Sequence, residues 1–425
     1  GQSVRKSVNS SESLQYLHAL GAELHPGRKF TLATIARLLD ALDNPQRAFA
    51  SVHIAGTNGK GSTAALIAAA ARAAGYRTGL YTSPHLQRVN ERIRIAGEDI
   101  APPDLAGAAT SVRDAVEQLL AADELPHPPA FFEVMTAIGF LALAHAGVEL
   151  AVVEVGLGGR LDATNVLAPL LAAITPVGLD HEAFLGPDIA SIAGEKAGII
   201  KPGVHAVVVA PQVPEAMAVI AARAQATNVP LLAIAAADAA SAPATALRGE
   251  HQRVNAAVAA AVCRQLGACG FPVPEAAIAT GFASVHWPGR LELICDHPQV
   301  FLDGAHNPMA ARALGAFLDT YAHTHPAPVL LFGCMRDKAL EEICEVLFPR
   351  AAAVVLTAPA HPRALAPAAL AEAYGPLAPR WEIAAAYPQA LAAARRISGA
   401  AGHPIFITGS LYLVGEAREY GCGPS

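Results

Sequence analysis

The sequence predicts an α/β protein with two domains, a larger N-terminal one and a smaller C-terminal one. The 425 residues are too many for one ordinary hydrophobic core. Short β-leaning runs alternate with helical patterns along the chain, which is typical of a mostly parallel sheet covered by helices. The run Trp287-Pro288-Gly289-Arg290 interrupts this alternation, and these residue types suit a fixed hinge. We therefore expect the domains to be residues 1–287 and 288–425.

The composition narrows the classes of partner and of location. Hydrophobic residues make up 53% of the chain, yet no apolar run reaches membrane-spanning length, and the polar start lacks the apolar core of a leader. A net charge of −6 with scattered basic residues argues against nucleic-acid binding. The six cysteines form no C-x-x-C pair and no zinc spacing, so reduced thiols are expected. We expect a cytoplasmic protein without nucleic-acid or membrane partners.

The first informative segment lies between a β-leaning run at residues 51–55 and an alanine-rich helix that begins at Lys60. A helix-like spacing of leucines over residues 13–42 precedes it. Exposed backbone N–H groups, a helix N-terminus and one lysine together favour phosphate binding, and the hydroxyls that follow suit a magnesium ion on the phosphates. The predicted nucleoside triphosphate site comprises Gly56, Thr57, Asn58, Gly59, Lys60, Gly61, Ser62 and Thr63.

This segment departs from the usual phosphate loop in two ways. The pattern G-x-x-x-x-G-K-[ST] requires a glycine where the chain has Ile54, and Gly61 separates Lys60 from the hydroxyl of Ser62. The alternative is a tight strand–turn–helix corner without a ligand. A lysine at the start of a helix is electrostatically unfavourable unless an anion lies nearby, so the phosphate interpretation is favoured.

Polar residues also follow other predicted strands. Ser83 follows a strand at residues 78–82, and Glu154 lies in a strand at residues 149–155. Ligands bind at the carboxyl ends of strands in open α/β sheets. Because Glu154 is flanked by valines, we expect its carboxylate either to be paired with another side chain or to coordinate a metal. Metal coordination is the favoured interpretation if the protein binds a nucleotide. Between these strands we expect a polar loop at residues 89–94 and a helix at residues 131–145.

Two further candidates come next in the chain. His181 follows a strand at residues 170–177, and Lys196 lies in a helix at residues 188–199. A lone histidine is usually a satisfied hydrogen-bonding residue, and a lone lysine is usually paired at the surface. Strands and helices alternate again to residue 234, and a helix at residues 251–266 carries Gln252 and Asn255.

The second domain repeats the alternation on a smaller scale. Asp303 and His306 follow its second strand. Pro308 comes next and is expected at the start of a helix, a position that proline often occupies. The expected strands are residues 291–295, 300–302, 329–332, 353–357, 381–384 and 405–408.

Eight motifs occur in one order over nearly the whole chain. They are Gly56-Thr57-Asn58-Gly59-Lys60-Gly61-Ser62, Thr82-Ser83-Pro84-His85-Leu86, Glu154-Val155-Gly156-Leu157-Gly158-Gly159, Leu179-Asp180-His181, Glu195-Lys196-Ala197-Gly198, Trp287-Pro288-Gly289-Arg290, Asp303-Gly304-Ala305-His306-Asn307-Pro308 and Thr408-Gly409-Ser410-Leu411-Tyr412.

The ordered set resembles the folylpolyglutamate synthase/dihydrofolate synthase family, relatives of the Mur cell-wall ligases. The inserted Gly61 fits this family. The resemblance implies a Mur-ligase-like architecture, with an N-terminal phosphate-loop ATPase domain and a C-terminal Rossmann-like domain for glutamate ligation.

The resemblance also implies a reaction. ATP phosphorylates a substrate carboxylate, and the amino group of L-glutamate attacks the acyl phosphate. The acceptor would be dihydropteroate, a reduced folate or both, and the enzyme is expected to be a monomer. Another Mur-type ligase and a non-catalytic nucleotide switch are the alternatives, although a switch has no need for an acyl-phosphate site.

Individual roles follow from the same resemblance. Ser62, Ser83 and Glu154 would hold a first magnesium ion, and Glu154 with His181 a second. Lys196 matches the family's carbamylated lysine, whose negative charge avoids the repulsion that an ammonium would meet beside divalent ions.

The remaining implied roles concern the nucleotide and the acceptor. Asn255 would lie on the adenine side, Asp303 would bind ribose or phosphate-side oxygens, and Arg290 and His306 would approach the phosphates. Residues 156–160, with Phe131, Phe132 and Glu133, would border the pterin-bearing substrate, although Glu133 could equally be an exposed helix carboxylate.

Overall fold

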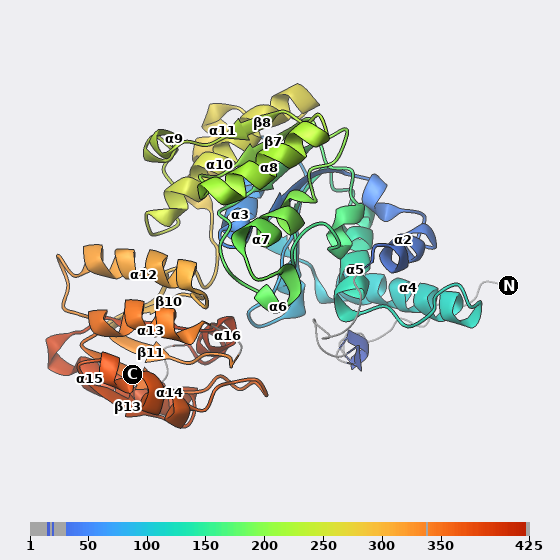
Figure 1. The fold of residues 1–425 in the computed structure, drawn as a ribbon. Helices are drawn as coiled ribbons and strands as arrows, with labels where there is room; N and C mark the ends of the chain where they lie inside the picture. The colour runs from blue at the N-terminus through green and yellow to red at the C-terminus, as the bar shows by residue number, and fades with distance from the viewer. Residues whose placement is uncertain (1–14, 18, 21–30, 337–338, 422–425) are drawn as a thin grey trace. The chain divides into compact units, whose positions relative to one another are not determined.

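The structure is a computed structural model that describes residues 15–17, 19–20, 31–336 and 339–421. The chain divides into two compact units, each built on its own sheet (Figure 1). The expected α/β class with two sheets is confirmed. Unit 1 comprises Gly1–Val177, His181–Ala244 and Val254–Ser284, and unit 2 comprises Gly178–Asp180, Thr245–Arg253 and Val285–Ser425.

Unit 1 is built on an eight-stranded sheet in the order β4-β3-β2-β5-β1-β6-β7-β8. The strands from β2 to β8 in this order are parallel, and β3 and β4 add an antiparallel edge. β5 is buried throughout, as expected of a parallel strand that is covered on both faces. The strands are β1 Ala50–Ala55, β2 Thr78–Tyr81, β3 Ile93–Ile95, β4 Glu98–Asp99, β5 Leu150–Glu154, β6 Leu171–Ile174, β7 Ala206–Val209 and β8 Leu231–Ala233.

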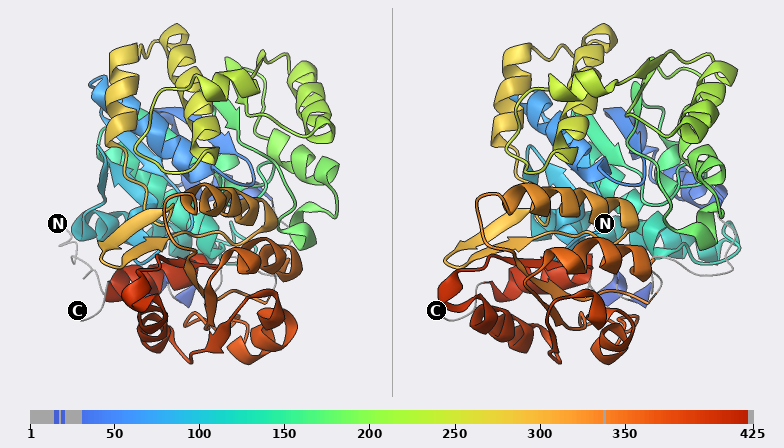
Figure 2. Two further views of the ribbon diagram at one scale, coloured as in Figure 1. Left: turned by 90° about the vertical axis from the view of Figure 1, so that its left-hand side faces the viewer. Right: turned by 60° about the vertical axis from the view of Figure 1, so that its left-hand side comes forward.

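Helices pack on this sheet through separate hydrophobic clusters. One cluster joins α2, α4 and α5 to β2 and β5, and another joins α7 and α8 to β6 and β7. α11 packs closely on α3 (yellow and blue in Figure 2). The approach is so close that a Cβ on Gly281 would lie only 2.4 Å from the backbone nitrogen of Ala70, so this position requires glycine. The helices are α2 Ala33–Asp40, α3 Lys60–Ala73, α4 Pro102–Ala121, α5 Phe131–His145, α6 Glu182–Leu185, α7 Ile189–Ala197, α8 Pro214–Ala226, α9 Ala236–Ala240, α10 His251–Leu266 and α11 Glu275–Ser284.

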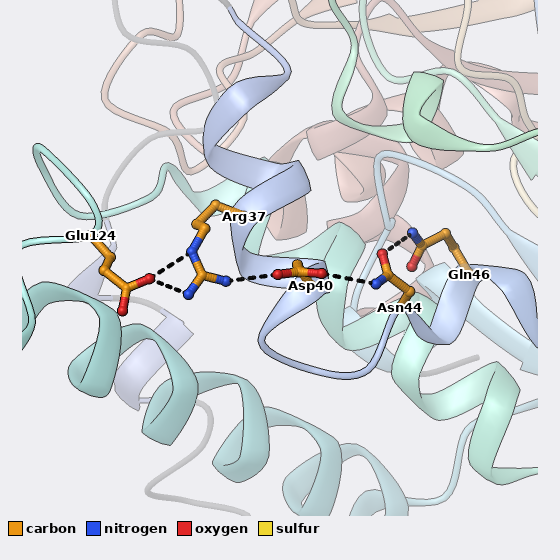
Figure 3. Close-up of polar contacts among 5 residues, drawn as sticks. All are labelled: Arg37, Asp40, Asn44, Gln46 and Glu124. Carbon is orange, nitrogen blue, oxygen red and sulfur yellow. Dashed lines mark hydrogen bonds and ion pairs between the residues drawn. The ribbon is translucent and has the colours of Figure 1, made fainter.

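A polar network links α2 to the segment after α4 (Figure 3). The Nε of Arg37 donates to Oε2 of Glu124 at 2.8 Å, and its Nη1 donates to Oδ2 of Asp40 at 3.1 Å. Asn44 donates to Asp40 at 3.2 Å and accepts from Gln46 at 3.0 Å. The Arg37 and Glu124 side chains are 35% and 45% exposed, so their ion pair contributes about 1 kcal/mol or less.

Unit 2 is built on a six-stranded sheet in the order β13-β12-β11-β14-β10-β9, in which only β9 is antiparallel to its neighbour. Its core is rich in phenylalanine, and the rings of Phe301 and Phe406 stack with centroids 4.6 Å apart. The strands are β9 Glu292–Asp296, β10 Gln299–Leu302, β11 Val329–Phe332, β12 Ala353–Leu356, β13 Trp381–Ile383 and β14 Ile405–Thr408. The helices are α12 Pro308–Tyr321, α13 Leu340–Leu347, α14 Pro367–Tyr374, α15 Tyr387–Ser398 and α16 Leu411–Tyr420.

Three expectations need correction or restriction. The prediction of a polar loop at residues 89–94 is wrong, because a 3-10 turn at Val89–Arg92 leads directly into β3. The Glu91 carboxylate stabilises this turn by accepting the N–H groups of Leu86 and Arg88. The prediction of reduced thiols is wrong for Cys295, which is disulfide-bonded. Cys422 lies outside the described residues, and the cysteines that are free are Cys263, Cys269, Cys334 and Cys344. Much of the helical spacing at residues 13–42 also lies outside them, and α2 occupies the described part.

No helix among the described residues is long and apolar enough to cross a membrane.

Candidate active site

The phosphate loop connects β1 to α3, as expected. Gly59 has φ +88 and immediately precedes α3, which begins at Lys60. A Cβ on Gly59 would lie 2.3 Å from Oδ1 of Asn255, so the loop requires glycine at this position and touches α10. The amides of Thr57 and Asn58 donate to the carbonyl of Pro176 at 3.0 and 3.4 Å. The first-turn amides of α3 therefore supply the backbone donors for an anion here, rather than every amide of the loop.

Two lysines converge on this loop. The Nζ of Lys60 donates to the carbonyls of Gly56 and Thr57 at 3.1 and 3.2 Å. The Nζ of Lys196, in α7, donates to the same Gly56 carbonyl at 2.8 Å, and this side chain is 4% exposed. Both side chains thus lie on one carbonyl oxygen beside the N-terminus of α3, where the helix dipole and the Lys60 ammonium favour an anionic ligand.

Glu154 lies at the same edge of the sheet. It pairs in register with Ile54 of β1, two residues before the loop, and it is 5% exposed. Its Oε2 accepts the backbone N–H of Ser83 at 3.2 Å, so the strand ends that were predicted to meet do meet. Ser62 is 2% exposed in the first turn of α3.

These oxygen donors fit magnesium. Mg²⁺ is usually held by one or two carboxylates together with substrate phosphates and water. Glu154, Ser62 and Ser83 offer one carboxylate and two hydroxyls next to the phosphate loop. Within the described ranges, no group of three or more His, Cys, Asp or Glu side chains could hold a metal ion. His181 immediately precedes α6 and has φ +53, and its approach to Glu154 stays a prediction.

A glycine turn follows Glu154 and is fixed by its neighbours. The Oδ2 of Asp162 accepts the N–H groups of Gly156 and Leu157 at 3.1 and 2.9 Å. A Cβ on Gly156 would lie 2.4 Å from the ring of Phe132, so this turn packs directly on α5. No role was predicted for Asp162 from the sequence.

In unit 2, the residues after β10 form a compact polar group. The Asp303 carboxylate accepts the N–H groups of Leu291 and Ala305, both at 3.0 Å. Burial raises the pKa of Asp303, while the charge of Arg290 and these two hydrogen bonds lower it. Arg290 itself donates to the carbonyl of Gly289 at 3.0 Å.

The His306 imidazole is oriented by the backbone. Its Nδ1 lies 2.7 Å from the Gly304 carbonyl, which can only accept, so Nδ1 carries a proton. Nε2 lies 3.8 Å from Oδ2 of Asp180, which also accepts from Nδ2 of Asn307 at 3.0 Å. Asp180 and Asn307 belong to two of the predicted motifs, but no role was predicted for them from the sequence.

Comparison with known proteins identifies the family. The family "Mur ligase, glutamate ligase domain" matches residues 289–411. The dihydrofolate synthase/folylpolyglutamate synthase of Mycobacterium tuberculosis is 37% identical over 91% of this chain and 89% of its own. The solved structure of Mycobacterium tuberculosis folylpolyglutamate synthase complexed with ADP and AMPPCP aligns with a TM-score of 0.87 and 35% identity, over 98% of this chain and 100% of that one. The solved structure of E. coli FolC in complex with DHPP and ADP aligns with a TM-score of 0.82 and 28% identity, over 96% and 97% of the two chains. The resemblance found in the sequence is thus confirmed, and the chain belongs to the folylpolyglutamate synthase/dihydrofolate synthase family.

Proposed function

We propose that this protein is an ATP-dependent ligase that joins L-glutamate to dihydropteroate, giving dihydrofolate, and to reduced folates. The observation that carries the proposal is the meeting of the phosphate loop, two lysines and Glu154 at one edge of the sheet. Membership of the family, with relatives named for both activities, supports the choice of substrates. A cytoplasmic location and a monomeric state stay predictions.

The reaction needs two bond exchanges. An oxygen of the acceptor carboxylate attacks the γ-phosphorus of ATP, forming an acyl phosphate and releasing ADP. The neutral amino group of glutamate then attacks the acyl carbon, the amide bond forms, and phosphate leaves while the nitrogen loses a proton. Phosphoryl transfer depends mainly on positioning and on neutralising charge.

The residues of this chain supply those two requirements. Lys60 and the first-turn amides of α3 would hold the β- and γ-phosphates, and Asn255 would lie against the adenine side. Magnesium, held by Ser62, Ser83 and Glu154 and in a second site by Glu154 and His181, would neutralise charge on the transferring group. Arg290, Asp303 and His306 would contact the nucleotide from unit 2, in the proposed C-terminal domain 288–425.

We also propose that Lys196 is carbamylated in the active enzyme. Its amine would attack carbon dioxide and release a proton, leaving a carbamate anion. The nearby Lys60 ammonium supports this step, because a second positive charge on the Gly56 carbonyl favours the neutral, nucleophilic form of Lys196.

Product identification tests the proposal. The protein would be incubated with ATP, magnesium and L-glutamate, together with 7,8-dihydropteroate or a reduced folate, and the products would be weighed by mass spectrometry. Gain of one glutamate by dihydropteroate, and serial gains by the folate, are expected. Phosphate release that depends on glutamate but yields neither product would refute the folate substrates and favour another Mur-type ligase. Phosphate release at the same rate with and without glutamate would indicate a nucleotide switch.

A further inference from the structure

A buried chain of hydrogen bonds runs from β1 to the glycine turn after Glu154. His53, in β1, is fully buried, and its Nε2 lies 2.8 Å from Oγ1 of Thr164. The Thr164 hydroxyl donates in turn to Oδ1 of Asp162, which also accepts the Thr164 backbone N–H at 3.0 Å. The other oxygen of Asp162 holds the turn through the amides of Gly156 and Leu157.

The direction of this chain is fixed by proton counting. A hydroxyl has one proton, and Thr164 uses it on the Asp162 carboxylate. The Thr164 oxygen must therefore accept from His53, so Nε2 of the imidazole carries the proton and Nδ1 does not. Every donor then points toward Asp162, which receives four hydrogen bonds as an ionised carboxylate.

Burial favours a neutral histidine, whereas the charged form of Asp162 is favoured by its four hydrogen-bond donors. Burial, aided by the charge of Lys201, lowers the pKa of His53 to about 3. Burial raises the pKa of Asp162, and the four donors oppose that rise by stabilising the charged form. The Nδ1 of His53 is buried without a hydrogen-bond partner, which costs about 1–3 kcal/mol that an aliphatic residue would avoid. A histidine that supplies only packing would carry this cost without any return.

We infer that His53 and Thr164 are positioning residues, which fix the Asp162 carboxylate and thereby the Gly156–Leu157 turn beside Glu154. The inference rests on the proposed function, in which this turn borders the acceptor substrate. His53 lies three residues before the phosphate loop, so the same short strand supports the nucleotide side and the acceptor side of the site. Neither residue touches substrate in this role.

Kinetics of matched threonine variants test the positioning role. Thr164→Val removes the hydroxyl at nearly constant volume, and we expect kcat/KM for the acceptor to fall about tenfold while KM for ATP changes less than about twofold. Thr164→Ser restores the hydroxyl and should recover most of the loss. Thr357→Val is the control, because Thr357 is a fully buried threonine of unit 2 whose hydroxyl has no hydrogen-bond partner. An effect of Thr164→Val no larger than that of the control, with both variants folded by circular dichroism, would overturn the inference.

A spectroscopic measurement separates this inference from the proposed function. In protein labelled with ¹⁵N-histidine, the His53 signals would be identified by their loss in His53→Gln. We expect a neutral ring with the proton on Nε2 that does not titrate down to about pH 5, and the same tautomer in Thr164→Ser. A proton on Nδ1, or titration near pH 6.5, would refute the hydrogen-bond chain even in a fully active ligase. The expected tautomer in a protein that makes no glutamate product would instead leave the chain standing and refute the proposed function.

Discussion

Replacing Gly59 with alanine tests the link between the phosphate loop and α10. Gly59 has φ +88, and an added Cβ would lie 2.3 Å from Oδ1 of Asn255 and 3.0 Å from its Cγ. The left-handed backbone costs a non-glycine residue about 1–2 kcal/mol. The contact adds a second effect, because the 4% exposed Asn255 side chain must move away from the loop.

The chain offers a matched control for this substitution. Gly75, just after α3, has φ +99, and a Cβ there would meet nothing within 4 Å. Gly75→Ala therefore carries the backbone strain without the collision. Gly75→Ala should lose about 1–2 kcal/mol of stability, which corresponds to a melting-temperature decrease of about 2–4 °C in a unit of this size, and Gly59→Ala should lose at least as much.

Nucleotide affinity should separate the two variants. We expect Gly59→Ala to weaken ATP binding at least about tenfold, equivalent to about 1.4 kcal/mol, while Gly75→Ala binds ATP like the parent protein. Isothermal titration calorimetry with a non-hydrolysable ATP analogue and magnesium would measure both. Equal affinities in Gly59→Ala and Gly75→Ala would refute the placement of ATP between this loop and Asn255.

Three more predictions concern charge. Glu154→Gln keeps an oxygen for the Ser83 N–H but removes the carboxylate charge, so the magnesium concentration for half-maximal activity should rise at least about fivefold; an unchanged requirement would remove Glu154 from the metal site. Lys196→Ala should abolish product formation while ATP binding persists in calorimetry, and partial rescue by small carboxylates would support the carbamate, whereas loss of ATP binding would assign Lys196 to the nucleotide instead. The folded-state pKa of His53 lies near 3, below the unfolded value of 6.5, so its contribution to stability is present above pH 6.5 and is lost as the pH falls toward 3, at up to about 1.4 kcal/mol per pH unit. Urea unfolding at about pH 7 and about pH 5 should show a smaller acid loss in His53→Gln, and an identical loss in both proteins would contradict this assignment.

The sequence predicted those parts of the site that depend on strand order alone. Ser83 and Glu154 follow strands whose carboxyl ends share one edge, so a parallel sheet brings them together whatever the details of packing. The same reasoning located β11 and β14 to the residue, because buried parallel strands are continuous apolar runs bounded by turn residues. The helices expected at residues 131–145 and 251–266 coincide with α5 and α10.

The sequence could not predict contacts that depend on the path of a turn. His53 and Thr164 are separated by more than a hundred residues, and their hydrogen bond exists because the chain folds back after the glycine turn. The prediction of a polar loop at residues 89–94 was wrong for a related reason. Their charges suggested solvent, yet Arg92 is 1% exposed, with its Nε 2.8 Å from Nδ1 of His85 and its guanidinium over the ring of Phe131. A charged residue that finds such partners folds inward, and only the tertiary structure supplies them.

Lys60 and Lys196 illustrate what the sequence leaves open even where residue types are predicted correctly. Lys60 was expected to bind the phosphates and Lys196 to lie at the metal site, and the structure brings both onto the carbonyl of Gly56. A γ-phosphate would then compete with that carbonyl for the Lys60 ammonium, so part of the attraction between ATP and the loop would offset the loss of its hydrogen bonds. Carbamylation of Lys196 would remove the second donor from the carbonyl and leave Lys60 to the phosphates. We therefore expect carbon dioxide to change the rate of ligation far more than the affinity for ATP, and an ATP affinity that depends on bicarbonate as strongly as the rate would assign Lys196 to the nucleotide.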